Sequence, residues 1–226
     1  MRVILLGAAN PHTEKLLAAV QRAQPGFQVA GFLDNDPQKK GQSFLGHPIL
    51  GGFEALESLD LREHLFVNLI TGSTRARYET SRALAQRGCR FTNLIHPSVD
   101  LGFVALGVGN YIQEGVLLQH SVRIGDNASI HMGALVGHET QIGNSVFVAH
   151  GVSLSGSVEI GDGTFVGTHA TVLPRVKIGR WCTIGAGAVV LKDVPDCTTV
   201  VGNPGRAIRT DLQLHASGDI FEGVTR

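Results

Sequence analysis

Two adjacent residues, His138 and Glu139, have side chains suited to acid–base chemistry. A neutral imidazole, with an ordinary pKa of about 6.5, can take a proton from an attacking amine or hydroxyl group. A carboxylate beside it can fix the imidazole tautomer and raise its basicity. The pair therefore fits a general base for attack on an acyl carbonyl. An exposed polar residue without a catalytic role is the alternative interpretation.

Four further histidines lie close to this pair in the sequence, and imidazole is also a common zinc ligand. They are His120, His131, His150 and His169. The chain has no H-x4-H segment in this region, and its three cysteines show no C-x-x-C spacing. We therefore expect no metal site, and a zinc enzyme is the weakest alternative.

An aliphatic residue recurs at every sixth position around these histidines. The series is Leu106, Ile112, Leu118, Ile124, Ile130, Val136, Ile142, Val148, Leu154, Ile160, Val166, Val172, Ile178, Ile184 and Val190. Glycine follows the aliphatic residue at positions 107, 125, 143, 161 and 179, so every third hexad is equivalent. Three hexads, or eighteen residues, then form one coil, and the repeat predicts a parallel β-helix of triangular cross-section.

The same register predicts which side chains fill the interior of the β-helix. The aliphatic residue points inward, and a small or β-branched residue four positions later fills the remaining space, with Asn110 as the one polar amide. The glycines at position 107 and its equivalents are expected to adopt corner conformations that other residues resist. His120 and His138 are eighteen residues apart, so they stack on one corner of neighbouring coils, whereas His150 falls on another.

The first ninety residues alternate strands with helices, which predicts a small parallel sheet of the Rossmann-like α/β class over residues 1–93. Ligands of such sheets bind at the carboxyl ends of the strands, and this placement suits a nucleotide. The first turn, residues 7–12, has one glycine where the dinucleotide fingerprint has three, so we do not expect an NAD site. Asp34, at the end of the second predicted strand, is either a ribose ligand or a solvated acid.

Composition limits the function classes further. Nineteen Lys and Arg balance nineteen Asp and Glu, so the chain lacks the charge excess of a nucleic-acid-binding protein. Charged residues are 17% and hydrophobic residues 43%, which is typical of a folded globular chain. No apolar run is long enough to cross a membrane, and we expect a cytoplasmic protein that binds no membrane.

Several segments together resemble a known family. The hexads, the pair His138–Glu139 and the segment 200–207 are similar to the left-handed β-helix, hexapeptide-repeat acyltransferases. Segments 32–35, 48–52 and 93–98 look like the sialic acid O-acetyltransferase group, which includes UDP-amino-sugar N-acetyltransferases for bacillosamine- and perosamine-type sugars. The resemblance implies a left-handed β-helix over residues 94–208, whereas the tail at 209–226 has no assigned role.

The resemblance also implies an activity. It implies direct acetyl transfer from acetyl-CoA to the amino group of a nucleotide-linked deoxyamino sugar in lipopolysaccharide or surface-glycan synthesis, in a homotrimer with active sites between subunits. His138 resembles the general base and Glu139 its support. The positions that match the family's acetyl-CoA contacts are Gly156, Thr168 and Ala186, the last through its backbone amide. The positions that match its nucleotide-sugar contacts are Asn10, Pro11, His12, Asp34, Asn35 and Gly72.

Two departures from the family pattern leave alternatives open. Pro11 removes a backbone N–H from the first turn, where a phosphate could have bound. Phe147 stands where the family often has a second histidine, which His150 could replace. The alternatives are a sugar O-acetyltransferase of the sialic acid branch and a trimeric sugar- or CoA-binding protein without activity.

Overall fold

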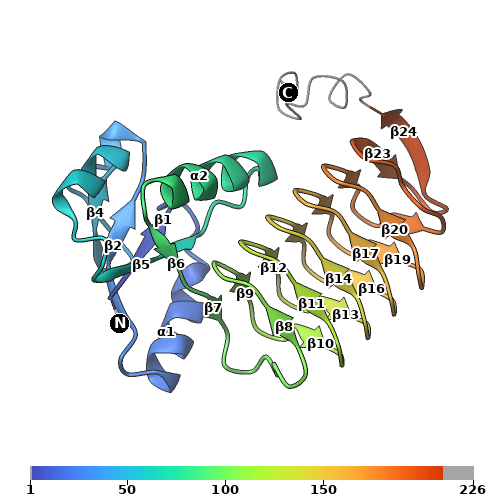
Figure 1. The fold of residues 1–226 in the computed structure, drawn as a ribbon, viewed down its shortest axis with the longest axis horizontal. Helices are drawn as coiled ribbons and strands as arrows, with labels where there is room; N and C mark the ends of the chain where they lie inside the picture. Colours follow the sequence, from blue (N-terminus) through green and yellow to red (C-terminus); the bar gives the residue numbers. More distant parts are fainter. Residues whose placement is uncertain (1, 211–226) are drawn as a thin grey trace.

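The computed structural model describes residues 2–210, which form an α/β unit followed by a β-helix (Figure 1). In the α/β unit, helices α1 (Thr13–Ala23) and α2 (Thr74–Gln86) accompany six strands. The strands are β1 (Arg2–Leu6), β2 (Gln28–Leu33), β3 (Ser43–Phe44), β4 (His47–Gly51), β5 (His64–Asn68) and β6 (Arg90–Phe91). Two 3-10 helices, η1 (Pro37–Lys39) and η2 (Phe53–Ser58), lie between them.

The strand order of this sheet is β3-β4-β2-β1-β5-β6. All neighbouring pairs run parallel except β3 and β4, so the sheet is mixed at one edge rather than wholly parallel as predicted. Alternate residues of β1 pack on opposite faces of the sheet: Val3 and Leu5 join the core under α1, whereas Ile4 and Leu6 join the core that contains Leu84 of α2. Because β1 lies between β2 and β5, the carboxyl ends of these strands form the switch point where such sheets bind ligands.

The β-helix has three faces, each a parallel sheet apart from the last strand of the second. The first face consists of β8 (Ala105–Leu106), β11 (Arg123–Ile124), β14 (Gln141–Ile142), β17 (Glu159–Ile160) and β20 (Lys177–Ile178). The second consists of β7 (Leu94–Ile95), β9 (Tyr111–Ile112), β12 (Ser129–Ile130), β15 (Phe147–Val148), β18 (Phe165–Val166), β21 (Thr183–Ile184), β23 (Thr198–Val201) and β24 (Arg206–Thr210). The third consists of β10 (Leu117–Leu118), β13 (Leu135–Val136), β16 (Ser153–Leu154), β19 (Thr171–Val172) and β22 (Val189–Val190).

The chain passes through the faces in the order first, second, third, and we name each corner after the faces that it joins. Corner 1–2 comprises residues 107–110, 125–128, 143–146, 161–164 and 179–182. Corner 2–3 comprises residues 113–116, 131–134, 149–152, 167–170 and 185–188. Corner 3–1 comprises residues 119–122, 137–140, 155–158 and 173–176, and the turn 101–104 before β8 stacks on it.

The coil length and the inward register are as predicted. Strands pair with the residues eighteen positions away, for example Leu135 with Leu117, so each coil contains three hexads. The aliphatic series is buried at every position from Ile124 to Val190, and its small partners are also buried. The amide of Asn110 is satisfied inside: its Oδ1 accepts from Ala128 N at 2.7 Å. The predicted fold class, a small α/β sheet followed by a β-helix, is confirmed.

The predicted reason for the glycines at 107 and its equivalents is wrong. The left-handed conformation falls instead on the residue two positions after them, as at Asn127 (φ 56°) and Ser145 (φ 53°). The glycines are required by space: at Gly125, a Cβ would lie 2.6 Å from Asn144 Oδ1. That oxygen accepts a hydrogen bond from the Asp126 amide at 2.8 Å, and Asn and Asp side chains repeat this contact between successive coils.

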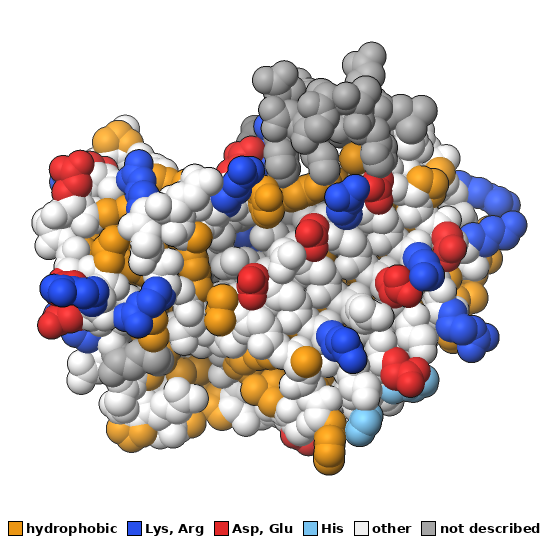
Figure 2. All heavy atoms as spheres, viewed as in Figure 1, with side chains coloured by type: hydrophobic (Ala, Val, Ile, Leu, Met, Phe, Trp, Pro, Cys, Tyr) orange, Lys and Arg blue, Asp and Glu red, His pale blue; other side chains and the backbone are white. Residues whose placement is uncertain are grey.

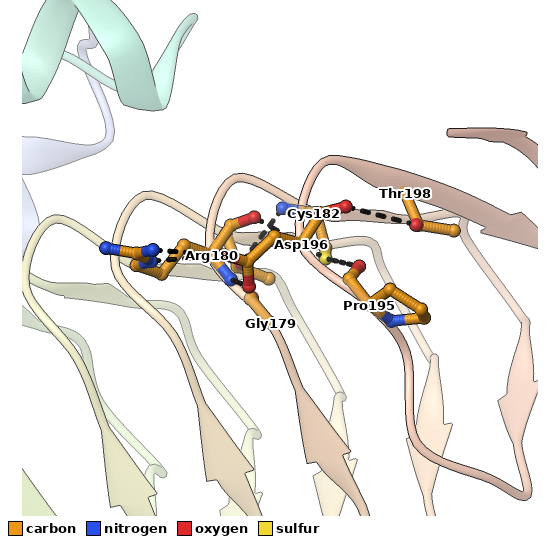
Figure 3. Close-up of polar contacts among 7 residues, drawn as sticks. Gly179, Arg180, Cys182, Pro195, Asp196 and Thr198 are labelled. Atoms are coloured by element: carbon orange, nitrogen blue, oxygen red, sulfur yellow. Dashed lines mark hydrogen bonds and ion pairs between the residues drawn. The ribbon is translucent and has the colours of Figure 1, made fainter. Parts of the chain in front are cut away.

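The last coil ends with the same contact, from a backbone amide to an Asp side chain of the following turn (Figure 3). Asp196 accepts from the Arg180 amide at 2.8 Å and pairs with the Arg180 guanidinium at 3.2 Å. Beside it, the thiol of Cys182 donates to the Pro195 carbonyl at 3.0 Å, and burial raises its pKa to about 11. Strand β24 then pairs with β23 and reaches Thr210, so the tail assigned to 209–226 begins as strand and its residues 211–226 lie outside the described part of the chain.

A buried arginine joins the α/β unit to the β-helix. Arg77 of α2 donates to the carbonyls of Asn68 and Ile70 in its own unit, at 2.7 and 3.1 Å. It also donates to the carbonyls of Asn127 and Ala128 on corner 1–2, at 2.5 and 3.2 Å. Burial lowers the pKa of Arg77 to about 9, so the guanidinium remains protonated at neutral pH. Its carbonyl contacts fix the position of the α/β unit beside the first coils.

Candidate functional site

Corner 3–1 brings together three of the predicted site residues. Backbone hydrogen bonds stack its turns, from Glu139 N to His120 O at 3.0 Å and from Ser157 N to His138 O at 2.7 Å. His138 and Glu139 are exposed on this corner, and Gly156 lies one coil further on. The stacking that the eighteen-residue spacing of His120 and His138 predicts is therefore present.

The carboxylate of Glu139 is held between two side chains. Ser157 Oγ donates to Glu139 Oε2 at 2.9 Å, and His138 Nδ1 lies 3.4 Å from the same oxygen. The hydrogen bond from Ser157, followed by the contact with His138, lowers the pKa of Glu139, which is therefore ionised at neutral pH. An ionised carboxylate on the Nδ1 side favours the tautomer that leaves Nε2 able to accept a proton. Ser157 is not among the predicted site residues, although it lies eighteen residues after Glu139.

Gly156 makes room for the imidazole. A Cβ at this position would clash with the ring of His138, so the absence of a side chain lets the ring extend over the next coil. Because the resemblance implies that His138 is the general base, we expect Gly156→Ala to shift the ring and to lower kcat about ten- to a hundredfold, the usual effect of a small displacement of a catalytic group. Thermal unfolding should barely change, since the ring can move into solvent. Gly26→Ala, where a Cβ meets nothing within 4 Å, is the control, and an unchanged kcat in Gly156→Ala would contradict this interpretation.

The other predicted acetyl-CoA residues lie on corner 2–3, across the third face from His138. Backbone bonds from His169 to His150 and from Gly187 to Thr168, at 2.9 and 2.8 Å, stack the turns that carry His150, Thr168 and Ala186. All three residues are exposed. One chain therefore does not bring this set together with the imidazole of His138.

An aromatic cluster adjoins corner 2–3. The rings of His131 and His150 lie 4.9 Å apart, and His131 lies 4.4 Å from the ring of Phe147. Burial, with additional repulsion from His150 and Arg77, lowers the pKa of His131 to about 3, so this imidazole is neutral. His150 and Phe147 thus both contact the ring of His131. Over residues 2–210, no group of three or more His, Cys, Asp and Glu side chains is arranged to hold a metal ion.

The α/β unit has a cavity of about 220 Å³ at its switch point. Of the predicted nucleotide-sugar residues, Asp34 and Asn35 line it, together with Gly7. Asn10, Pro11, His12 and Gly72 do not line it. They lie in the loops that precede α1 and α2. Within the described part of the chain, none of the helices is long and apolar enough to cross a membrane.

The carboxylate of Asp34 is engaged within the protein. Partial burial raises its pKa, but bonds from Lys39 Nζ at 2.8 Å and from the amides of Asp36 and Ala8 outweigh this effect and lower the pKa. These contacts fix the first loop against the second strand. Any nucleotide contact of Asp34 must therefore share an oxygen that already accepts a bond, and Lys39 is a cation beside the cavity that the sequence analysis missed.

Comparison with known proteins now identifies the family. The model for "Bacterial transferase hexapeptide (six repeats)" matches residues 139–173 and 157–192. A perosamine N-acetyltransferase from Caulobacter crescentus, solved as a variant with CoA and GDP-perosamine, is 32% identical, with 92% of this chain and 97% of that chain covered and a TM-score of 0.83. A comparison with curated protein sequences found no match.

Other solved structures agree. The acetyltransferase domain of PglB from Neisseria gonorrhoeae, in complex with acetyl coenzyme A, is 28% identical over 92% of this chain and 98% of that chain, with a TM-score of 0.82. WeeI from Acinetobacter baumannii, at 24% identity and a TM-score of 0.80 over 92% of this chain and 100% of that chain, shares the fold. The predicted family is confirmed: this chain belongs to the hexapeptide-repeat acyltransferases and is an acetyltransferase.

Proposed function

We propose that the protein transfers an acetyl group from acetyl-CoA to the amino group of a nucleotide-linked deoxyamino sugar. The observation that carries the proposal is the exposed His138 imidazole beside the ionised Glu139 carboxylate, which Ser157 holds in place. The 32% identity to an enzyme solved with CoA and GDP-perosamine supports this choice of substrates.

The reaction requires one general base and one hydrogen-bond donor to the oxyanion. The amine nitrogen of the sugar attacks the carbonyl carbon of the thioester, and a C–N bond forms between them. The amine proton passes to His138 Nε2. The tetrahedral intermediate then collapses, the C–S bond breaks, and the proton on His138 passes to the departing thiolate to give CoA. A backbone amide, for which we propose that of Ala186, stabilises the oxyanion. No acyl-enzyme is formed, because the acceptor attacks the thioester directly.

We further propose that the site is assembled between copies of the chain in a homotrimer. Corners 2–3 and 3–1 border the same face, the third, whose outer surface carries Leu117 at 61% exposure and Leu135 at 46%. If three β-helices pack their third faces around a common axis, corner 2–3 of one copy meets corner 3–1 of the next. His138 and Gly156 of one subunit would then face Thr168 and Ala186 of its neighbour.

Leu135→Asp tests this arrangement. A carboxylate in the centre of the buried face should convert the trimer to monomers, because burying an unpaired charge costs several kcal/mol. Light scattering after size exclusion measures the mass, and CoA release should fall with it. Gln141→Asp, on the outer side of the first face, is the control and should remain trimeric and active. A trimeric Leu135→Asp protein would exclude the third face as the interface.

For the α/β unit, we propose that the nucleotide of the acceptor binds in the cavity lined by Gly7, Asp34 and Asn35. Asn10, Pro11, His12 and Gly72 would contribute from the adjoining loops. Acetyl-CoA and nucleotide sugars are cytoplasmic metabolites, which supports a cytoplasmic role in surface-glycan synthesis.

The experiment that tests the function is an assay of CoA release with acetyl-CoA and a panel of UDP-, GDP- and dTDP-linked amino sugars. Release with one acceptor, together with a product heavier by one acetyl group, is the expected result. Thermal stabilisation by one of the nucleoside diphosphates UDP, GDP and dTDP would identify the nucleobase of the acceptor. A ligand that binds only the native state raises the stability of that state. Release with a sugar hydroxyl acceptor alone would indicate O-acetylation. No release with any acceptor would overturn the proposed choice of acceptor.

A further inference from the structure

An exposed aromatic stack lies on the same corner as His138. The ring of Phe103 packs on the imidazole of His120, with centroids 4.9 Å apart and planes inclined by 27°. Ser121 Oγ lies 2.6 Å from His120 Nδ1 and fixes the orientation of the imidazole. The stack is therefore held in place from within the chain.

The stack is continuous with the proposed catalytic pair. Ser121 N bonds to Phe103 O at 3.0 Å, and Glu139 N bonds to His120 O at 3.0 Å, so the three coils follow one another along corner 3–1. His120 is close enough to Glu139 for its charge to contribute to the lowered pKa of that carboxylate. The rings of Phe103 and His120 thus border the site on the coils before His138. Gly156 and Pro174 border it on the coils after His138.

This surface differs from the rest of the corner. The positions equivalent to Phe103 in the next four coils hold polar or charged residues, Ser121, Glu139, Ser157 and Arg175. Phe103 is 82% exposed and has a φ of 60°, a conformation that is unusual for a bulky side chain. Packing within the chain buries little of the Phe103 ring. One face of the ring stacks on His120, and the other face is accessible to another molecule.

The side that precedes His138 is also the side of the acceptor. The α/β unit contacts corner 2–3 through the Lys15–Glu114 ion pair on the first coil. It contacts corner 1–2 through Arg77 on the second coil and through Tyr78, whose ring lies 5.3 Å from that of Trp181 on the fifth coil. In the proposed trimer, corner 2–3 of a neighbouring subunit, which α1 of that subunit contacts at the first coil, meets corner 3–1. A nucleotide sugar bound to the neighbour's α/β unit then approaches His138 from the side of the first coils. Figure 2 shows histidine side chains gathered at the lower edge of the β-helix, beside acidic and apolar side chains.

We propose that the sugar ring of the acceptor stacks on the ring of Phe103, which His120 supports, while the amine of the sugar approaches His138. The apolar face of a pyranose packs against an aromatic ring, and such stacking contributes binding without acting on the reacting atoms. Phe103 is thus a specificity-determining residue for the acceptor. This inference rests on the proposed acetyltransferase function.

Steady-state kinetics of Phe103→Ala test the inference, with acetyl-CoA and whichever UDP-, GDP- or dTDP-linked amino sugar the wild-type protein acetylates. We expect the KM for the amino sugar to rise about three- to tenfold, while the KM for acetyl-CoA stays unchanged. Phe103→Tyr keeps the ring and should restore the wild-type KM. Val108→Ala, which truncates a residue 49% exposed on corner 1–2 of the same coil, is the matched control and should behave as wild type.

Three results would overturn the inference. An unchanged KM for the amino sugar in Phe103→Ala would show that the ring does not contact it. Loss of the trimer in this variant, measured by light scattering, would show that Phe103 belongs to the subunit interface instead. Absence of CoA release in the wild-type protein would defeat the proposed function and this inference together, whereas the first two results leave the proposed function intact.

Discussion

His138→Asn lowers kcat by about 10²- to 10⁴-fold, the usual contribution of a general base. The asparagine side chain is close in size to the imidazole, but its amide cannot take the proton of the attacking amine. Because His138 is exposed and contributes little packing, the variant should keep its trimeric mass and its melting temperature. The measurement is CoA release under saturating acetyl-CoA and acceptor, with light scattering and thermal unfolding on the same preparation.

His47→Asn, on β4 of the α/β unit, is the matched control for replacing a histidine and should retain wild-type kcat. Activity of His138→Asn within tenfold of wild type would exclude His138 as the base. A less severe variant, Ser157→Ala, releases the Glu139 carboxylate without changing the imidazole. Its effect on kcat should be smaller than that of His138→Asn, because Glu139 and His138 remain in contact at 3.4 Å.

Arg77→Met lowers the free energy of unfolding by about 3 kcal/mol or more, the largest effect on stability that we expect from a single polar contact network. The substitution keeps the length and apolar stem of the side chain but removes the donor of four carbonyl groups, of which those of Asn68 and Ala128 are buried and those of Ile70 and Asn127 partly buried. The Ala128 carbonyl keeps the bond from Tyr111 N. Each unsatisfied buried acceptor costs about 1–3 kcal/mol, reduced where the carbonyl has a second partner. Urea denaturation measures the change.

The matched control is Arg82→Met, an exposed position on the same helix, for which we expect a change below about 0.5 kcal/mol. Because the guanidinium of Arg77 contacts both parts of the chain, its removal should also weaken their attachment. Separate unfolding transitions for the α/β unit and the β-helix would report this loss. A change below about 1 kcal/mol with a single transition would contradict the role assigned to Arg77.

The six-residue period predicted most of the β-helix correctly because it encodes packing directly. A residue that must fill a narrow interior can only be aliphatic or small, so the register of Ile130, Val148 and Val166 is visible without the structure. The stacking of His120 and His138 follows from the same arithmetic. What the period did not reveal is the reason for Gly125 and its equivalents, because the crowding there comes from the Asn144 side chain of the neighbouring coil.

The site was less accessible to sequence reasoning than the fold. Arg77 donates to backbone carbonyls about fifty positions away. Every residue has a backbone carbonyl, so the residue types do not show which carbonyls accept these hydrogen bonds. Asp34 could be assigned to a strand end, but its pairing with Lys39 depends on the turn of η1. The separation of Thr168 and Ala186 from His138 by a whole face also needed the structure to show that one chain carries only half of the arrangement.

The coil of eighteen residues also determines how the length of this protein can change. Removing or adding one complete coil would leave every later residue on its own face, so the rod can shorten or lengthen while its surfaces keep their composition. Removing a single hexad would instead turn every later residue to the neighbouring face. The polar outer residues of β14 and β17 (Gln141 and Glu159) would then lie on the third face, and the outer residues of the third face would move to the second. We therefore expect this β-helix to tolerate insertions and deletions only as whole coils or as loops that leave a corner and return to it.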